Sequence, residues 1–281
     1  MISYDFDYYK PTSIKEAAEL HQRLVSEGRK PKFFSGGTEI ITLGRLNLIY
    51  TDAIIDIKGI PECKRWGFEK NELIAGAALS LSLLEEEPHF PLLKQTASEV
   101  ADYTSRNKIT LGGNVCGQVF YREAVLPFLL AESDVIVGGR KGVRRVPIRT
   151  MFHQELTLEP GEFLVQIITE EAYIDAPFLS VKKRQQWETG YPLITVASLK
   201  KDNFLRFAFS GVCAFPFRSD EMEQVLNDAT MTYEDRVLKS FNYLPKPILN
   251  DVEGSDEYRL FVLKNTLVDF LKHFESGGVH E

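Results

Sequence analysis

The sequence predicts an α+β protein in which an N-terminal α/β region precedes a smaller unit of strands and helices. Up to about residue 172, short apolar strands alternate with helical segments, and glycine pairs stand at strand ends. The composition shifts slightly near Tyr173, and consecutive strands followed by helices are typical of a separate α+β unit. We therefore expect domains at 1–172 and 173–281. The second has a three-stranded sheet (about 178–181, 194–199 and 206–212) and helices at about 219–226, 233–238 and 257–274.

The composition is that of a soluble globular protein with an acidic balance. Of 281 residues, 44% are hydrophobic and 26% charged, enough for two or three subdomains around real cores. The formal net charge of -7 argues against a nucleic-acid binder, which needs a basic face, and short basic runs such as 182–184 are typical of solvated surface. The N-terminus lacks signal-peptide features, and no apolar run approaches the roughly 18 residues of a membrane span. We expect a cytoplasmic protein.

Helix-start signals place the first helix after Pro11. Thr12 and Ser13 can cap it, and Gly28 ends it. A short strand at about 32–35 then runs into Gly36-Gly37, and a helix opens at about residue 39. A strand, a glycine-rich turn and a helix start together favour an anion, although the pair taken alone is more simply a tight turn.

A second glycine pair follows strands predicted at about 53–57 and 73–77 and helices at about 82–87 and 92–103. Its run, Thr110-Leu111-Gly112-Gly113-Asn114, echoes Ser35-Gly36-Gly37-Thr38-Glu39. Adjacent glycines permit positive φ and carry no Cβ atoms that would keep an anion from backbone N–H groups, so each run could wrap a phosphate. Two such loops suggest one diphosphate.

The third glycine pair, Gly138-Gly139, predicts a hairpin. A helix-compatible run at 125–131 and a strand at 135–137 precede it, and a basic strand follows without a helix to supply a dipole. An alternating strand is predicted at 163–168.

No side-chain pattern predicts a catalytic group or a metal ligand. The five histidines are scattered, and the three cysteines are far apart, which argues against a Ser-His-Asp set, a metal site and a disulfide framework. Cys116 is either a nucleophile or, as free cysteines usually are, a small buried hydrophobe. What remains is a nucleotide or dinucleotide binder whose cofactor performs the chemistry.

Ordered motifs cover nearly the whole chain. They are Tyr4-Asp5-Phe6 with Pro11-Thr12-Ser13, Ser35-Gly36-Gly37-Thr38-Glu39, Ile55-Asp56-Ile57 with Ile60, Ile74-Ala75-Gly76-Ala77, Arg106-Asn107, Thr110-Leu111-Gly112-Gly113-Asn114, Val146-Pro147-Ile148, Tyr191-Pro192-Leu193-Ile194-Thr195-Val196-Ala197 and Pro216-Phe217-Arg218. Their order and spacing resemble the FAD-binding medium subunit of the molybdenum hydroxylases, the xanthine dehydrogenase and carbon monoxide dehydrogenase family.

The resemblance implies a two-subdomain FAD-binding domain of the PCMH/vanillyl-alcohol-oxidase type, with α/β subdomains at about 1–55 and 56–172, followed by a C-terminal flavoprotein domain. The FAD diphosphate lies between the two glycine loops. By position, the cofactor-binding residues are Phe33, Phe34, Ser35, Gly36, Gly37, Thr38, Glu39, Ile40, Val100, Thr110, Leu111, Gly112, Gly113, Asn114, Glu123, Leu164, Lys183 and Tyr191.

Several of these positions carry a specific expectation or an alternative. Tyr191 matches a residue close to the flavin ring, whereas Glu123 stands where the family commonly has an aspartate near the ribose or adenine. Ile109 stands where many relatives have glycine. As alternatives, Val100 and Leu164 are simple core residues and Lys183 is simple surface.

The resemblance further implies an oxidoreductase subunit. In relatives, a molybdenum-cofactor large subunit oxidises the substrate, and electrons cross the iron–sulfur clusters of a small subunit to the flavin, which passes them to NAD+ or another acceptor. This chain lacks the cysteine sets that such clusters require. We therefore expect the FAD-dependent component of a xanthine-dehydrogenase-type complex for a purine or related heterocycle. Glu123 and Ile109 motivate one alternative, a flavin-free assembly or maturation protein with the same fold, and a stand-alone flavin oxidase is another.

Overall fold

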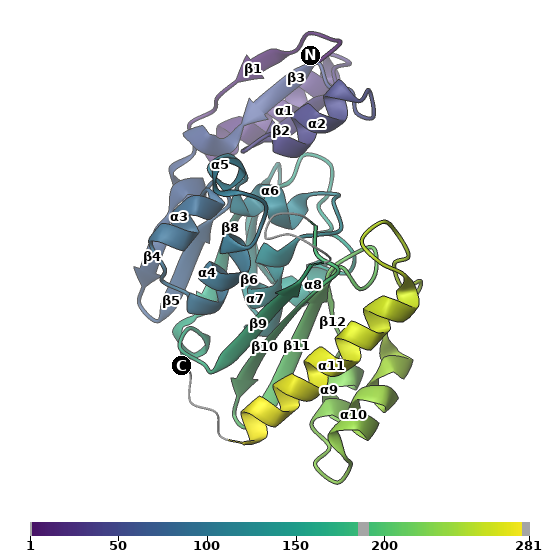
Figure 1. Cartoon of the computed structure of the whole chain (residues 1–281). Helices are drawn as coiled ribbons and strands as arrows, with labels where there is room; N and C mark the ends of the chain where they lie inside the picture. The colour runs from purple at the N-terminus through teal and green to yellow at the C-terminus, as the bar shows by residue number, and fades with distance from the viewer. Residues whose placement is uncertain (1, 185–190, 277–281) are drawn as a thin grey trace.

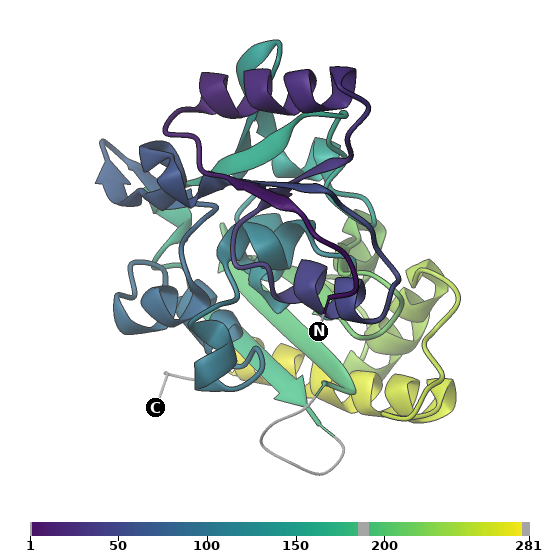
Figure 2. The same cartoon turned by 90° about the horizontal axis from the view of Figure 1, so that it is seen from above.

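The computed structural model describes residues 2–184 and 191–276, which form three sheets with helices between and around them (Figure 1). The first sheet is parallel, with strand order β1-β3-β2. Its strands are β1 (Asp7–Tyr9), β2 (Pro31–Phe34) and β3 (Ala53–Asp56). Helices α1 (Ile14–Ser26) and α2 (Thr38–Arg45) lie on opposite faces of this sheet (Figure 2). The predicted cap of α1 is confirmed, because the Ser13 side chain accepts a hydrogen bond from Glu16 N.

The second sheet has five strands in the order β4-β5-β8-β6-β7. They are β4 (Trp66–Glu69), β5 (Glu72–Gly76), β6 (Asp134–Gly139), β7 (Gly142–Pro147) and β8 (Phe163–Glu170). Every neighbouring pair in it is antiparallel, which corrects the expectation of an α/β subdomain in this region. The predicted hairpin at Gly138-Gly139 is confirmed by the β6–β7 pairing.

Short helices surround the second sheet. They are α3 (Leu81–Glu86), α4 (Pro91–Ser98), α5 (Tyr103–Arg106), α6 (Leu111–Cys116), α7 (Leu126–Leu130) and α8 (Ile148–Met151). The single helix predicted at 92–103 is wrong, because Ala101 has a φ of 50° and Asp102 caps a new helix, α5. The second glycine pair also lies in a helix, α6, and not in a loop.

The C-terminal sheet has four antiparallel strands in the order β12-β11-β10-β9, one more than predicted. They are β9 (Phe178–Lys183), β10 (Ile194–Lys201), β11 (Phe204–Ser210) and β12 (Phe217–Arg218). Helices α9 (Asp220–Leu226), α10 (Tyr233–Ser240) and α11 (Asp256–Glu275) follow, as the sequence predicts. Figure 1 shows α11 crossing this sheet. The division into domains at residue 173 stays a prediction.

The two faces of the C-terminal sheet pack against different parts of the molecule, because side chains alternate between the faces along each strand. Val196 and Phe207 belong to the core that the sheet forms with the C-terminal helices. Ala197, Leu199 and Ala208, on the other face, belong to the large core of the N-terminal part. The C-terminal sheet therefore packs directly on the rest of the molecule, with β9 against α4.

Candidate cofactor-binding cleft

The two glycine runs meet at a single hydroxyl group. Gly36 N donates to Thr110 Oγ1 over 3.4 Å, and Gly113 N donates to the same oxygen over 3.2 Å. Thr110 is the N-cap residue of α6, and Gly37, with a φ of 72°, begins α2. The runs that the sequence separates by some seventy residues are therefore one local structure.

Close packing requires glycine at this junction. A Cβ atom on Gly36 would lie 1.9 Å from Lys108 O, and one on Gly112 would lie 2.8 Å from Ala77 O. A Cβ atom on Gly113 would meet only Thr110 Oγ1, at 3.0 Å. Gly36 and Gly112 thus serve the fold, whereas Gly113 lies at the wall of a cavity.

A cleft with two chambers opens on either side of this junction. The first chamber has a volume of about 200 Å³ and the second about 550 Å³. Four residues, Thr38, Glu39, Gly113 and Gly117, line both chambers. The chambers are therefore adjoining parts of one site, with the two glycine runs between them.

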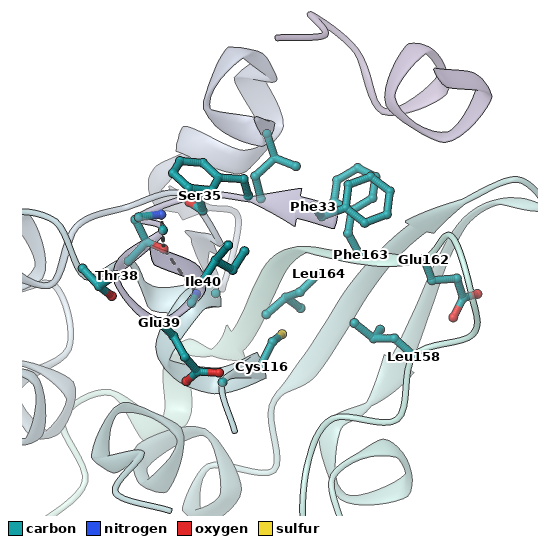
Figure 3. Close-up of a pocket in the computed structure, with 18 residues that line it drawn as sticks. Phe33, Ser35, Thr38, Glu39, Ile40, Cys116, Leu158, Glu162, Phe163 and Leu164 are labelled. Carbon is teal, nitrogen blue, oxygen red and sulfur yellow. Dashed lines mark hydrogen bonds between the residues drawn. The ribbon is translucent and has the colours of Figure 1, made fainter. Parts of the chain in front are cut away.

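The first chamber is a largely apolar slot. The rings of Phe33 and Phe163 lie 4.6 Å apart between centroids, and Leu158 and Leu164 continue the wall. Figure 3 shows Ile40 and Cys116 beside Leu164, with the Phe33 and Phe163 rings next to each other. Such a slot suits a flat or apolar group of a ligand.

Most predicted site residues come together in this cleft. The first chamber is lined by Phe33, Phe34, Ser35, Gly36, Gly37, Thr38, Glu39, Ile40, Thr110, Gly112, Gly113 and Leu164, and the second by Thr38, Glu39, Val100, Gly113, Asn114, Glu123 and Tyr191. Ile109 also lines the second chamber. Leu111 is fully buried in the large core and lines neither.

Lys183 is exposed and lines neither chamber, whereas the neighbouring Lys182 lines the second chamber. Side chains alternate along β9, so Lys182 points into the cleft. Its Nζ lies 2.9 Å from Glu123 Oε1, with both side chains only 2% exposed, and it also donates to Glu99 O over 2.6 Å. The structure thus places Lys182, and not Lys183, beside Glu123.

Two tyrosines form another wall of the second chamber. Tyr191, which is more than half exposed, stacks on Tyr121 with ring centroids 4.8 Å apart. Tyr121 Oη donates to Asp251 Oδ2 over 3.4 Å, and Asp251 is ion-paired with the fully buried Arg259. Burial and the nearby Asp251 raise the pKa of Tyr121 to about 12, so it remains a neutral aromatic surface.

Sequence reasoning missed Tyr121, Arg122 and Lys182. The period-2 alternation of the 178–183 strand would have separated Lys182 from Lys183 if it had been applied to side-chain direction. No local pattern marks Tyr121 and Arg122, because Tyr121 bonds to Asp251 and one of the two carbonyls that Arg122 bonds to, Gln154 O, is also distant in the sequence. Their roles depend on contacts made only after folding.

Polar groups in the predicted site hold the protein together as well as facing the cleft. The Glu39 carboxylate accepts hydrogen bonds from Gln118 N at 2.9 Å and from Val119 N at 3.4 Å. Asn114 Oδ1 accepts one from Ala124 N at 3.2 Å. The Glu39 bonds fix the segment after α6 against α2, and the Asn114 bond fixes α6 against the segment around Ala124.

Burial raises the pKa of the Cys116 thiol to about 12. A thiol that stays protonated at neutral pH is a poor nucleophile, so the small-hydrophobe interpretation fits better. Among residues 2–184 and 191–276, no group of three or more His, Cys, Asp or Glu side chains is placed to hold a metal ion. Nor does any helix in those ranges have the length and apolar character needed to cross a bilayer.

The junction has free hydrogen-bonding groups that fit a phosphorylated ligand. The N-cap residue of α2 is Gly37, which has no side chain to cap the first turn, whereas Ser13 caps α1 and Thr110 caps α6. Ser35 Oγ, in the same run, is buried and has no hydrogen-bond partner among the described residues. Backbone N–H groups at the start of a helix bind phosphate oxygens well. The residues present therefore fit a diphosphate.

Known proteins similar to this chain bind FAD. The family described as "FAD binding domain in molybdopterin dehydrogenase" matches residues 4–169. The chain is 26% identical to a putative xanthine dehydrogenase FAD-binding subunit of Escherichia coli K12, over 93% of each chain, and 23% identical to the nicotinate dehydrogenase FAD-subunit of Eubacterium barkeri, over 97% and 98%.

The fold is shared with two solved structures. Carbon monoxide dehydrogenase from Hydrogenophaga pseudoflava superposes with a TM-score of 0.84 at 22% identity, over 96% of each chain. Quinoline 2-oxidoreductase from Pseudomonas putida 86 superposes with a TM-score of 0.83 at 20% identity, over the full length of both chains.

Proposed function

Because the chain belongs to the family of FAD-binding domains in molybdopterin dehydrogenases, we propose that it is the electron-transfer subunit of a molybdenum hydroxylase and holds FAD in the two-chamber cleft. The chain is an oxidoreductase subunit, and its cofactor is FAD. The observation that carries the cleft assignment is the junction of both glycine runs at Thr110 Oγ1. The residues at this junction would hold the diphosphate.

Each part of the cleft has a role in this proposal. The uncapped first turn of α2 offers N–H groups to the diphosphate, and Gly113 leaves the space that it needs. The chambers would hold the two ends of the cofactor, and Tyr191, stacked on Tyr121 in the second chamber, would contact the flavin ring. When bound, FAD supplies the redox chemistry, taking electrons from an iron–sulfur partner and giving them to NAD+ or another acceptor. The side chains orient the cofactor and exclude water, and none acts as a general base.

The proposed partners are a molybdenum-cofactor large subunit and an iron–sulfur small subunit. We propose a purine or a related nitrogen heterocycle as the substrate of that complex. Xanthine and nicotinate dehydrogenase subunits are among the relatives, which supports a heterocycle. The substrate itself would be chosen in the large subunit.

Titration of flavin-free protein with FAD tests the cofactor site. Saturable binding with the visible absorption of a flavoprotein is expected, and a colourless protein that ignores added FAD would favour the flavin-free assembly protein. Co-purification followed by analysis for molybdenum and iron tests the partners. Turnover of a substrate by the isolated chain would instead support a stand-alone oxidase.

A further inference from the structure

Arg122 is a buried cation at the wall of the second chamber. The residue is 3% exposed and lies directly before Glu123. Its Nη1 donates to Gly117 O over 2.9 Å, its Nη2 donates to Gln154 O, and its guanidinium lies 5.4 Å from the centre of the Phe152 ring. These contacts hold the guanidinium in place through neutral groups only.

Arg122 has no counter-charge in contact with it. Within residues 2–184 and 191–276, no carboxylate oxygen lies within 4.0 Å of its guanidinium, and its Nε has no hydrogen-bond partner. Other buried cations are paired: Arg218 with Glu223 at 2.7 Å, Arg259 with Asp251, and Lys182 with Glu123. An unpaired buried charge is costly, so such a group calls for an anion that the chain itself does not supply.

The charges around the cleft favour the same conclusion. Glu39, Asp102 and Glu123 line the second chamber, against Arg122 and Lys182, and Lys182 is already neutralised by Glu123. An anionic ligand entering this chamber meets an acidic wall and one unpaired cation. Burial lowers the pKa of Arg122, and the more distant carboxylates of Glu155 and Glu39 oppose that change. A bound anion would remove the cost of this burial.

One of the three groups that hold the guanidinium belongs to the junction of the chambers. Gly117, whose carbonyl oxygen accepts from Nη1, is one of the four residues that line both chambers. Another of the four is Glu39, whose carboxylate at this junction would repel a phosphate. A cation beside Gly117 offsets that repulsion.

We propose that Arg122 supplies the counter-charge to the FAD diphosphate at the junction. The inference rests on the proposed function, because it needs FAD in this cleft. Arg122, which lies outside both glycine runs, would provide the electrostatic part of diphosphate binding. The runs themselves supply N–H groups and space.

The test uses Arg122→Met with Arg218→Met as a matched control. Both arginines are buried, but Arg218 is paired with carboxylates and lines neither chamber. The thermal midpoint of the flavin-free chain is measured first. Arg122→Met should lower the midpoint less than Arg218→Met does, because it removes an unpaired charge as well as the hydrogen bonds to Gly117 O and Gln154 O. Arg218→Met should lower it, because Glu223 loses its partner.

Binding of FAD, ADP and riboflavin to the same proteins is then measured. Arg122→Met should lower the affinity for FAD and for ADP by about 10- to 100-fold, as expected for the loss of one charge-assisted hydrogen bond. The affinity for riboflavin should not change. Arg218→Met should leave all three unchanged. Arg122→Lys, which keeps the charge, should lose less affinity for FAD than Arg122→Met, and it serves if the Met variant does not fold.

Three results would overturn the inference. A lower thermal midpoint of Arg122→Met with unchanged FAD affinity would show that Arg122 only stabilises the fold, by joining two loops. A lower affinity for riboflavin with an unchanged affinity for ADP would place the charge of Arg122 at the flavin ring and not at the diphosphate. Arg122→Lys binding FAD as poorly as Arg122→Met excludes a role for charge. Failure of the wild-type chain to bind FAD would instead contradict the proposed function.

Discussion

Thr110 Oγ1 accepts a hydrogen bond from Gly36 N across a sequence separation of 74 residues. The same oxygen caps α6 through Gly113 N. One hydroxyl therefore connects the first sheet to the helix that carries the second glycine pair, at the point where the chambers adjoin.

Replacing Thr110 by Val should lower the free energy of unfolding by about 1 kcal/mol, the usual value of a helix cap, and weaken FAD binding. The affinity falls because both glycine runs lose their common acceptor. Thr232→Val is the control, since Thr232 caps α10 and lines neither chamber. Chemical denaturation and FAD titration measure the two effects. Equal FAD affinity in both variants would contradict the role of the contact.

Gly113→Val should abolish FAD retention and leave the flavin-free fold intact. A Cβ atom at this position has only Thr110 Oγ1 as a near neighbour, at 3.0 Å, so the valine side chain should occupy the space that the diphosphate needs. Gly36→Ala should instead destabilise the fold, because its Cβ atom would overlap Lys108 O. Circular dichroism and flavin absorption after purification separate the two. Normal flavin content in Gly113→Val would count against the site.

Lys182→Met should destabilise the chain by about 3–5 kcal/mol, because it leaves the Glu123 carboxylate buried without its partner. Lys183→Met is the control and should change stability by less than about 0.5 kcal/mol, since Lys183 is exposed. Adding Glu123→Gln to Lys182→Met should restore part of the loss. The reverse order of effects for the two lysines would show that Lys183 faces the cleft.

Cys116 should react slowly with iodoacetamide in the folded protein. With its thiol pKa near 12 instead of 9.0, the reactive thiolate at pH 8 is about 1,000-fold rarer than in a free thiol. Mass spectrometry of the labelled protein, with urea-unfolded chain as the control, measures the rate at this residue. Cys116→Ala should also keep FAD, and rapid labelling of Cys116 in the folded chain would revive the nucleophile interpretation.

Local signals were sufficient for the elements that depend on nearby residues. Ser13 caps α1 as its position predicts, and the strand, glycine pair and helix around Gly37 follow the expected order. The helix α6 was not predicted, because glycines disfavour helices. Two conditions outweigh that preference, the Thr110 cap and the burial of Leu111 and Val115.

Contacts between distant segments were beyond sequence reasoning. A shift of one residue along β9 exchanges Lys182 for Lys183 in the cleft, which a positional match at low identity does not resolve. Arg122 binds Gln154 O and Gly117 O, and Tyr121 binds Asp251 from the far end of the chain. The glycine runs marked the place of the site, whereas its charges were set by tertiary contacts.

The two-faced C-terminal sheet has a thermodynamic consequence. Residues 173–281 made alone would expose Ala197, Leu199 and Ala208 to water, and residues 1–172 alone would lose Lys182 and Tyr191 from the cleft. The intact chain should consequently melt in one calorimetric transition, with equal van't Hoff and calorimetric enthalpies. The regions on either side of residue 173 would then unfold together as one cooperative unit.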